Sequence, residues 1–171
     1  MVLWHLGIGA LLTYVTLGRR RVDYRYVLVG AVAPDVLDAV LTALGAPTAG
    51  GRGPAHSLLT VVLVAVTVVA VFSGTLRLQV FGLAVGWLTH LVADGLWSAP
   101  ELFLWPAFGW SFEAPVGEPY SFDLVTHPVD HLSTWAGEVV GAAALAWLFI
   151  AHRLGEERRF ELFLKDGYLR P

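Results

Sequence analysis

Long apolar segments alternate with shorter polar connections along most of the chain. Each segment is close to the ~20 residues that an α-helix needs to cross ~30 Å of hydrocarbon. A backbone in lipid must satisfy its own hydrogen bonds, so even a valine run such as VVLVAVTVVAVF predicts a helix rather than a strand. The pattern predicts an all-α fold, a polytopic transmembrane bundle of about five helices in one domain over residues 1–171. The five segments are 2–17, 26–44, 55–72, 78–98 and 135–152.

Composition supports the membrane assignment and narrows the chemistry. Of the 171 residues, 56% are hydrophobic and 15% are charged, which is too apolar for an ordinary soluble domain. The chain has no cysteine, so disulfides and thiolate metal ligands are excluded. The net charge of -3 gives no reason to expect nucleic acid as a partner.

Positive charge gathers in three connections that alternating spans would place on one side of the membrane. Ten of the 11 Lys and Arg residues lie there, and Arg52 is the exception. Because cytoplasmic connections carry the excess of Lys and Arg, we expect a multi-pass inner (plasma) membrane protein with its N-terminus outside and a cytoplasmic tail over residues 153–171. The first segment has no basic residue before its apolar core and GRRR after it, which indicates an uncleaved anchor. The ten residues are Arg19, Arg20, Arg21, Arg25, Arg77, Arg153, Arg158, Arg159, Lys165 and Arg170.

The connection over residues 99–134 is long, acidic and free of Lys and Arg. It is rich in aromatic residues and prolines, so we expect an ordered extracytoplasmic loop that folds back over the outer face at headgroup level. The tail, EERRFELFLKDGYLRP, mixes charges with large apolar residues. It predicts either an amphipathic helix on the inner membrane surface or a short solvated tail.

Several ionisable residues lie inside the apolar segments. A charge at the bilayer centre costs at least ~2.5–3.5 kcal/mol on insertion scales, so it usually marks a site. Asp35 and Asp38 are three residues apart and share a helix face, and His90 and Asp94 do so at a spacing of four. The predicted topology places both pairs toward the outer side. There they would meet two residues from the starts of other segments, His5 and His56.

Convergence of these residues in one pocket would explain why the sequence tolerates their cost. One or more divalent cations would offset the charge of the carboxylates. Imidazole and carboxylate ligands without sulfur suit zinc, with manganese and iron as alternatives. Each residue also has a simpler explanation: His90 as a packing residue, Asp38 as a helix cap or a partner of Arg52, and His5 as an interfacial residue. A proton relay built on the same residues is the other functional interpretation.

A second group of polar residues precedes the last segment, in THPVDHLST. His127 and His131 would share a face if this stretch is helical, and they would then complete a second metal position. The alternative is an ordinary helix N-terminus. His152 lies at the inner end of the last segment and is expected to be unrelated to the site.

An ordered set of motifs resembles the YdjM-like family of inner-membrane, metal-dependent hydrolases. The set comprises His5 with Gly9, then APDVLD, RGPAHSLL at 52–59 and THLVADGLWSAPELFLWPAFGW at 89–110. It covers most of residues 1–110, and the later parts of the chain do not match. That family is distantly similar to zinc-dependent phospholipases C and to single-strand nucleases, which favours cleavage of a phosphoester. The resemblance implies a helical membrane hydrolase whose divalent metal is bound by His5, Asp35, Asp38, His56, His90 and Asp94.

The mechanism that we expect is hydrolysis by a metal-activated water. His56, His90 and Asp94 would be the core ligands and would leave one coordination position open. Asp38 would bridge a second metal, and either Asp35 or Asp38 would act as general base.

Other polar residues would serve substrate binding. Arg52, the only cationic residue expected outside, would contact an anionic group such as a phosphate; the alternative is a salt bridge to Asp38 or Glu101. Ser57 would orient His56. The expected substrate is a membrane lipid or lipid-linked molecule that enters sideways from the outer leaflet, with the aromatic loop as a lid or wall.

Two other functions would use the same residues. A metal-ion or proton transporter or sensor needs polar residues that continue to the inner side, and the third and last segments offer almost none. A non-catalytic membrane scaffold would leave the convergence of polar residues from four segments unexplained. The sequence does not indicate an oligomeric state.

Overall fold

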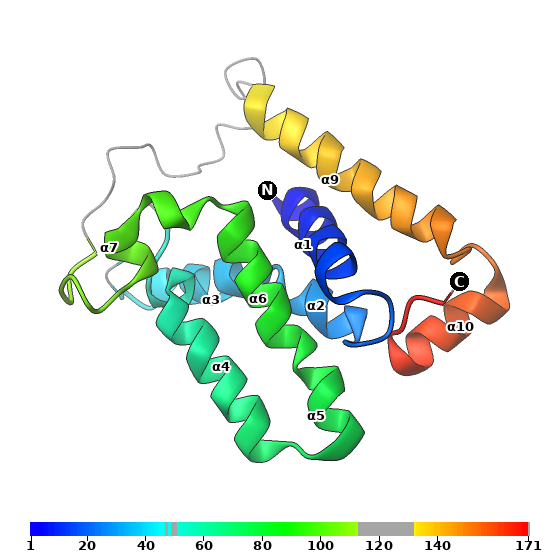
Figure 1. Cartoon of the computed structure of the whole chain (residues 1–171). Helices are drawn as coiled ribbons and strands as arrows, with labels where there is room; N and C mark the ends of the chain where they lie inside the picture. The colour runs from blue at the N-terminus through cyan, green and yellow to red at the C-terminus, as the bar shows by residue number, and fades with distance from the viewer. Residues whose placement is uncertain (47, 49–50, 113–131, 171) are drawn as a thin grey trace.

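The computed structural model describes residues 1–46, 48, 51–112 and 132–170, and these residues form helices without strands (Figure 1). Helices occur in all five apolar segments, so the all-α prediction is confirmed. The elements are α1 (Val2–Leu17), α2 (Tyr24–Gly30), α3 (Ala33–Ala43), the 3-10 turn η1 (Pro54–His56), α4 (Leu58–Val71), α5 (Gly74–Val80), α6 (Gly82–Ala93), the 3-10 turn η2 (Leu96–Ser98), α7 (Pro100–Phe103), α9 (Leu132–Ala151) and α10 (Glu157–Asp166).

Within the described residues, three helical stretches are long and apolar enough to cross a membrane. They are Tyr24–Ala43, which joins α2 and α3, Gly74–Ala93, which joins α5 and α6, and α9. α1 and α4 are apolar but shorter, with 16 and 14 residues. The fourth predicted segment also ends early: α6 stops at Ala93, because Gly95 adopts a left-handed conformation with φ 66°.

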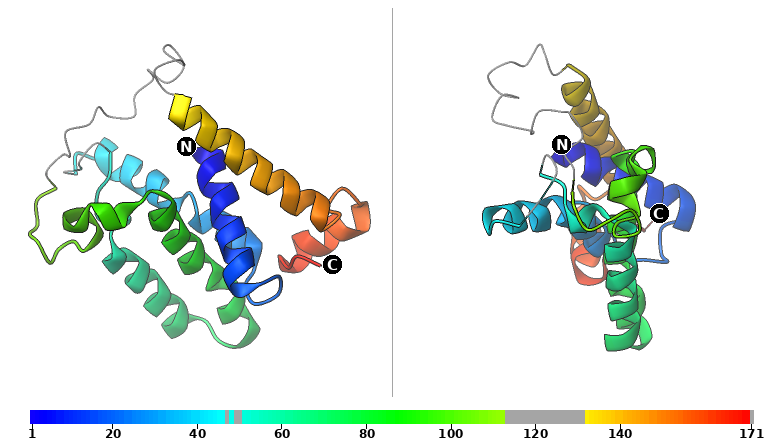
Figure 2. Two further views of the ribbon diagram at one scale, coloured as in Figure 1. Left: turned by 45° about the horizontal axis from the view of Figure 1, so that its top comes forward. Right: turned by 90° about the vertical axis from the view of Figure 1, so that its left-hand side faces the viewer.

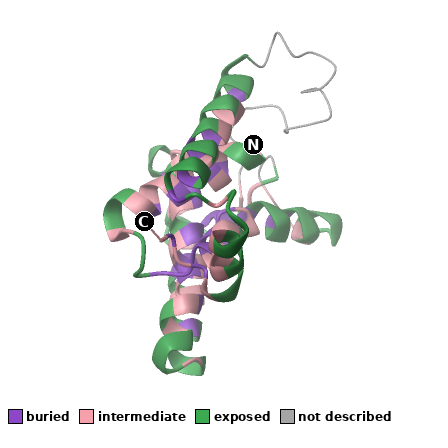
Figure 3. Cartoon of the chain, turned by 90° about the vertical axis from the view of Figure 1, so that its right-hand side faces the viewer, coloured by how far each residue is buried: buried purple, intermediate pink, exposed green. Residues whose placement is uncertain are grey.

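Most of the helix surface is exposed, and the exposed side chains are largely apolar, as contact with lipid requires. Only 22–39% of each of the three spanning windows is buried. Figure 3 shows that the buried positions lie where helices meet, while the outer faces are open. On α4 the open face carries Leu63, Val66 and Val69, and a soluble protein rarely exposes such a large apolar patch.

The second span breaks between Gly30 and Ala33, and Pro34 is the physical reason. Proline lacks the N–H that would bond to the carbonyl of Gly30, and its ring collides with that carbonyl. The chain resumes as α3 with Pro34 in the first turn. α3 therefore leaves the direction of α2 and extends sideways from the bundle (Figure 2). The break also makes the carbonyl of Ala31 available to a side chain from another helix.

Glycines set the closest helix contacts. α1 and α9 run parallel, and a Cβ atom at Gly7 would overlap the backbone of Gly141. α2 and α6 also run parallel, and they approach in the same way through Gly30 and Gly86. In lipid, helices associate by van der Waals packing rather than by the hydrophobic effect, so this close approach stabilises the bundle.

A carboxylate within α9 holds the start of α1. Glu138 Oε2 accepts a hydrogen bond of 2.7 Å from the backbone N–H of Leu3. The first amides of a helix have no acceptor within that helix, so Glu138 satisfies one of them. This partner also accounts for an acidic residue inside an apolar span.

The tail forms α10 and then packs against the turn between α1 and α2. Tyr24 N donates to Gly167 O at 2.9 Å, and Leu169 N donates to Arg19 O at 3.2 Å. The Leu169 side chain is buried in a core supplied by α1, α2 and α9. The expectation of a short solvated tail is therefore wrong, because the residues after α10 complete this core.

An ion pair fixes the chain after α10. Burial acts to raise the pKa of Asp166, but the hydrogen bonds from Arg170 and the Tyr168 N–H, together with the charges of Arg170 and Arg25, hold that pKa below its usual range. Asp166 is thus a carboxylate at neutral pH. The ion pair between Asp166 and Arg170 fixes the chain that follows Gly167. Gly167 ends α10 because it adopts a left-handed conformation with φ 71°.

The contact between α1 and α9 is tested by Gly141→Ala. The added methyl group would overlap the backbone of Leu3 and Trp4, so we expect a destabilisation of about 1–3 kcal/mol and a lower Tm in detergent. Gly155→Ala is the matched control, because a Cβ atom there would meet Phe149 at 3.5 Å, an ordinary contact. Equal Tm values for the two variants would contradict the close packing of α1 on α9.

Candidate metal centre

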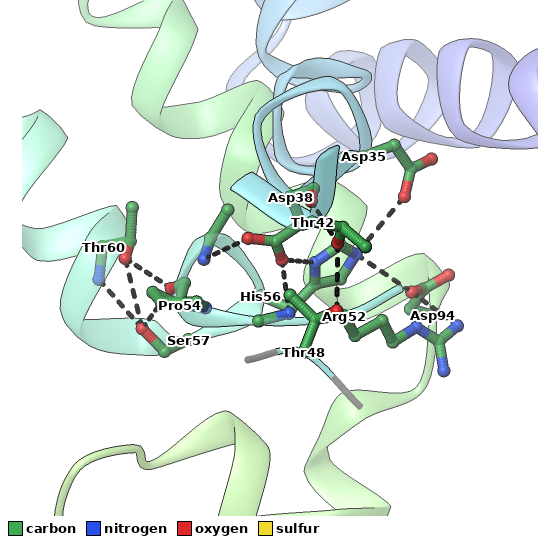
Figure 4. Close-up of polar contacts among 12 residues, drawn as sticks. Asp35, Asp38, Thr42, Thr48, Arg52, Pro54, His56, Ser57, Thr60 and Asp94 are labelled. Carbon is green, nitrogen blue, oxygen red and sulfur yellow. Dashed lines mark hydrogen bonds and ion pairs between the residues drawn. The ribbon is translucent and has the colours of Figure 1, made fainter. Parts of the chain in front are cut away.

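The six ionisable residues singled out in the sequence lie together at one end of the bundle. His5 comes from α1, the two aspartates Asp35 and Asp38 from α3, His56 from η1, and His90 with Asp94 from the end of α6. Five of these side chains are 0–3% exposed, whereas the Asp35 side chain is 45% exposed. Figure 4 shows Asp35, Asp38 and Asp94 arranged around the His56 ring.

The His90 ring is held by the break in the second span. Its Nδ1 lies 2.8 Å from the carbonyl oxygen of Ala31. Because a carbonyl only accepts, Nδ1 carries the proton and donates it. The other ring nitrogen, Nε2, therefore has a free lone pair when the ring is neutral. Pro34 is the sequence feature behind this contact, since it breaks the helix that would otherwise use the carbonyl.

The His56 ring is held by Asp38. His56 Nδ1 lies 2.6 Å from Asp38 Oδ2, which also accepts from the backbone N–H of Gly53 at 2.6 Å. Asp38 Oδ1 accepts from the N–H of Ala55 at 3.1 Å. Both oxygens of this buried carboxylate are thus occupied, and Nδ1 of His56 is the donor to it. Asp38 thus orients His56 and shapes η1, whereas its role as a bridge to a second metal or as a base stays a prediction.

Two ring nitrogens with free lone pairs face each other in the centre of the cluster. His56 Nε2 and His90 Nε2 are 3.2 Å apart. Asp35 Oδ1 lies 3.3 Å from the first and 3.6 Å from the second. Asp94 Oδ2 lies 3.8 Å and 3.9 Å from them. Four atoms that each offer electrons repel one another unless a positive charge lies between them.

Three of these donor atoms, from His56, His90 and Asp35, fit neighbouring corners of a tetrahedral metal site. Ligand bonds of about 2.0–2.1 Å place the corners of a regular tetrahedron about 3.3–3.4 Å apart. The donor atoms of His56, His90 and Asp35 are 3.2 to 3.6 Å apart and are close to that arrangement. Asp94 Oδ2 lies 3.8 Å and 3.9 Å from the two imidazoles, but it does not belong to this compact group of three. Among the described residues the charges agree, because the carboxylates of Asp35, Asp38 and Asp94 exceed the guanidinium of Arg52 by two negative charges. The residues therefore fit a divalent cation with imidazole and carboxylate ligands.

His5 and Asp94 extend the cluster toward α1. His5 Nε2 lies 2.8 Å from Asp94 Oδ1, and the His5 ring stacks on the His90 ring with 4.0 Å between the centroids. His5 Nδ1 is buried without a hydrogen-bond partner among the described residues, 3.7 Å from Asp35 Oδ2. His5, His90 and Asp94 also form a second group of donor atoms that lie within 4.8 Å of one another.

Arg52 and Ser57 have other partners than the sequence suggested. Arg52 Nη2 pairs with Asp94 Oδ2 at 2.8 Å, instead of with Asp38 or Glu101. The Ser57 hydroxyl donates to the Pro54 carbonyl at 2.7 Å and accepts from the N–H of Thr60 at 3.3 Å. Ser57 therefore caps α4, and its role in orienting His56 stays a prediction.

The remaining histidines do not join this cluster in the part of the chain that the structure describes. His127 and His131 lie outside the described residues, so a second metal position there stays a prediction. His152 directly follows α9, at the end of the helix away from Leu132. The Nδ1 of His152 donates to Arg170 O at 2.7 Å. Two contacts that position the site had no sequence signal of their own: the Ala31 carbonyl, and the 2.8 Å hydrogen bond from Trp87 Nε1 to Ala55 O that holds η1.

The role of Asp38 is tested by Asp38→Asn with Ser57→Ala as control. An amide in place of the carboxylate weakens the hold on the His56 tautomer, so we expect metal affinity to fall about 10–100-fold. Ser57→Ala should lower stability by about 1 kcal/mol and leave metal affinity unchanged. Titration of the metal-stripped proteins with zinc measures both affinities. An unchanged affinity in Asp38→Asn would overturn the assignment.

Comparison with known proteins agrees with the sequence motifs. No curated protein and no solved structure matches the chain. A family model described as YdjM inner membrane protein matches residues 1–159, which include all six residues of the cluster and the five apolar segments. The chain belongs to the YdjM inner membrane protein family.

Proposed function

We propose that this protein is a membrane-embedded, metal-dependent hydrolase that cleaves a phosphoester or related bond in a lipid or lipid-linked substrate. The observation that carries the proposal is the pair of facing Nε2 atoms of His56 and His90, 3.2 Å apart, with carboxylate oxygens of Asp35 and Asp94 around them. A site of this composition suits zinc, with manganese and iron as alternatives. When bound, such a cation polarises a phosphoryl or carbonyl oxygen and makes water a nucleophile at neutral pH.

The surrounding residues fix the ligand geometry before a cation arrives. Asp38 and the Ala31 carbonyl each hold one imidazole through its Nδ1–H. His5 and Arg52 contact separate oxygens of Asp94. Preorganised ligands bind with a smaller loss of conformational freedom, and they keep their orientation during a reaction.

Asp35 is the residue of the cluster that a substrate would reach. Its side chain is 45% exposed, and it lies in the first turn of α3, where the helix dipole favours a negative charge. One oxygen faces the two imidazoles and the other lies 3.7 Å from His5 Nδ1. Asp35 therefore acts as both a ligand and the general base that takes a proton from water.

Arg52 would bind the anionic part of the substrate. Its side chain is 28% exposed and pairs with Asp94 at the edge of the cluster. A guanidinium has five donors in a planar fork, so it can contact Asp94 and a phosphate oxygen at the same time. This position beside a divalent cation favours a phosphoester over a neutral ester or amide.

The distribution of charge supports a site that faces the extracytoplasmic side. The cluster lies near the start of α1 and the end of α6, whereas Arg19–Arg21 and the tail with α10 lie at the other end of α1. An excess of Lys and Arg marks the cytoplasmic side. The N-terminus and the site would then face outward, and the substrate would come from the outer leaflet.

A proton relay is the alternative that the geometry also accommodates. One additional proton on His56 Nε2 would separate the facing nitrogens and donate to Asp35 or His90. This single added positive charge would leave the cluster more negative than a bound divalent cation would. Thr13 lies further along α1, away from the cluster. Its buried hydroxyl already donates to the Gly9 carbonyl. A transporter would need such groups to carry ions or protons across the bundle.

Metal content and hydrolysis together test the proposal. Purified protein should retain at least one zinc ion per chain after loading and dialysis, and should release diacylglycerol or a headgroup from a phospholipid panel in a chelator-sensitive way. His90→Ala should lose the metal and reduce hydrolysis to the level of the metal-free protein. His152→Ala, which removes a buried histidine at the other end of the molecule, should retain both.

Other outcomes would favour other functions. Wild-type protein without bound metal after loading would remove the main support for a hydrolase. Uptake of labelled zinc into proteoliposomes, without hydrolysis of any lipid, would favour transport.

A further inference from the structure

The segment after α6 presents an aromatic surface next to the metal centre. Trp97, Phe108 and Trp110 are 64%, 63% and 76% exposed, and Leu104 is 40% exposed. We propose that these four residues, the interfacial patch, bind the lipid headgroup layer of the leaflet at which the metal centre opens. Binding of the patch to lipid does not depend on the proposed function, whereas the inference about the substrate rests on that function.

The patch is rigidly attached to the wall of the metal centre. Leu96 and Leu102 are buried, and Phe103 and Phe112 pack with them against a core that includes Ala55. Ala55 directly precedes His56, and its N–H donates to Asp38. The Trp105 ring stacks on Phe112 and meets Trp110 edge to face, so part of the patch is fixed by aromatic contacts. The patch and the turn that carries His56 therefore share one packed core.

The chemistry of the patch favours lipid as its partner. Glu101 is the only charged residue between positions 96 and 112. On α6 the exposed residues Leu88 and Val92 lie on the lipid-facing side, and Trp97 follows them after the helix ends. The patch thus continues an apolar surface that already faces the bilayer. A protein partner would find few charged or hydrogen-bonding groups to recognise here.

The backbone of the segment places it at headgroup depth rather than in the hydrocarbon core. Residues 104–112 form turns, a bend and irregular chain, so their backbone groups lack the continuous hydrogen bonding of a helix. Hydrocarbon does not tolerate irregular backbone that is exposed to lipid. Tryptophan and other amphipathic aromatic rings are favoured at the interface, where water and polar headgroups satisfy such groups.

This depth has a consequence for the substrate. Asp35 and Arg52, the exposed side chains of the centre, would lie at the level of lipid phosphates instead of in the aqueous phase. A phosphate in the headgroup of a membrane lipid could reach them without leaving the bilayer. The structure thus assigns the substrate to the class of bilayer-resident phospholipids, in preference to soluble phosphoesters.

Spin labels on single cysteines measure the depth directly. The sequence has no cysteine, so Phe108→Cys and Trp110→Cys each create a unique labelling site in the full chain. The reference positions are Arg20→Cys in the polar turn after α1 and Val66→Cys on the exposed face of α4. The proteins are reconstituted in vesicles of phosphatidylethanolamine and phosphatidylglycerol. Accessibility to oxygen and to a water-soluble nickel complex is then recorded.

The labels at 108 and 110 should give values between the two references, with less nickel accessibility than Arg20→Cys and less oxygen accessibility than Val66→Cys. Nickel accessibility equal to that of Arg20→Cys would mean that the patch faces water and would overturn the proposal. Protection from both reagents would mean that protein covers the patch, and would overturn it as well.

Activity separates the substrate inference from the anchor. Phe108→Ser should lower turnover of phospholipid in these vesicles several-fold and leave turnover of a water-soluble, short-chain phosphodiester unchanged. Phe160→Ser, at an exposed aromatic residue on α10, should change neither rate. Equal loss on both substrates would overturn the bilayer route. If wild-type protein cleaves neither substrate, the proposed hydrolase function fails, and the spin labels still decide whether the patch is an anchor.

Discussion

Six ionisable side chains can share the interior of an apolar bundle only when each proton and each lone pair has a defined position. The cluster meets this requirement with two buried acceptors. Asp38 takes the Nδ1 proton of His56, and the carbonyl of Ala31 takes that of His90. Each contact commits one ring to a single tautomer, and the two remaining lone pairs then converge on one point. The shape of the helices around the cluster follows from the need to keep these two acceptors in place.

Backbone groups fix the orientation of the two imidazole rings as much as side chains do. Pro34 breaks the second span and so releases the Ala31 carbonyl. η1 interrupts the entry to α4, and its N–H groups at Gly53 and Ala55 bind Asp38. The indole of Trp87 fastens the same turn from α6. Irregular backbone at membrane depth is tolerated where protein buries it, and here it lies against the polar cluster.

The parts that the sequence predicted are those that depend on the cost of a polar group in lipid. His5, Asp35, His56, His90 and Asp94 stand out because little else in the apolar segments is ionisable. Helical spacing puts His90 and Asp94 on one face, and the predicted topology brings His5 and His56 to the same side. The five helical segments follow from hydropathy in the same way. The tail gave an ambiguous signal, because its charges hide the contribution of Leu169 to the core.

The parts that the sequence left open depend on which partner each group selects. Asp38 had several plausible partners, and the path of the chain at η1 decides among them. Ser57 stands next to His56 in the sequence, but as the cap of α4 it turns toward Thr60. Arg52 pairs with Asp94, which lies at the end of α6, about forty residues later in the sequence. A backbone acceptor such as the Ala31 carbonyl carries no residue identity at all, so the sequence has no direct signal for it.

The parallel pairing of α1 with α9 bears on how the chain enters the bilayer. Ribosomal synthesis delivers α1 first and α9 after the other spans. The tightest contact of the first helix, at Gly7 and Gly141, therefore awaits the last one, and so does the acceptor that Glu138 provides for Leu3. His5 likewise has no Asp94 beside it until the span that ends in α6 has been inserted. The polar cluster is therefore complete only after α6 has joined α1, and the start of α1 is held only after α9 has joined it, which makes both late events of biogenesis.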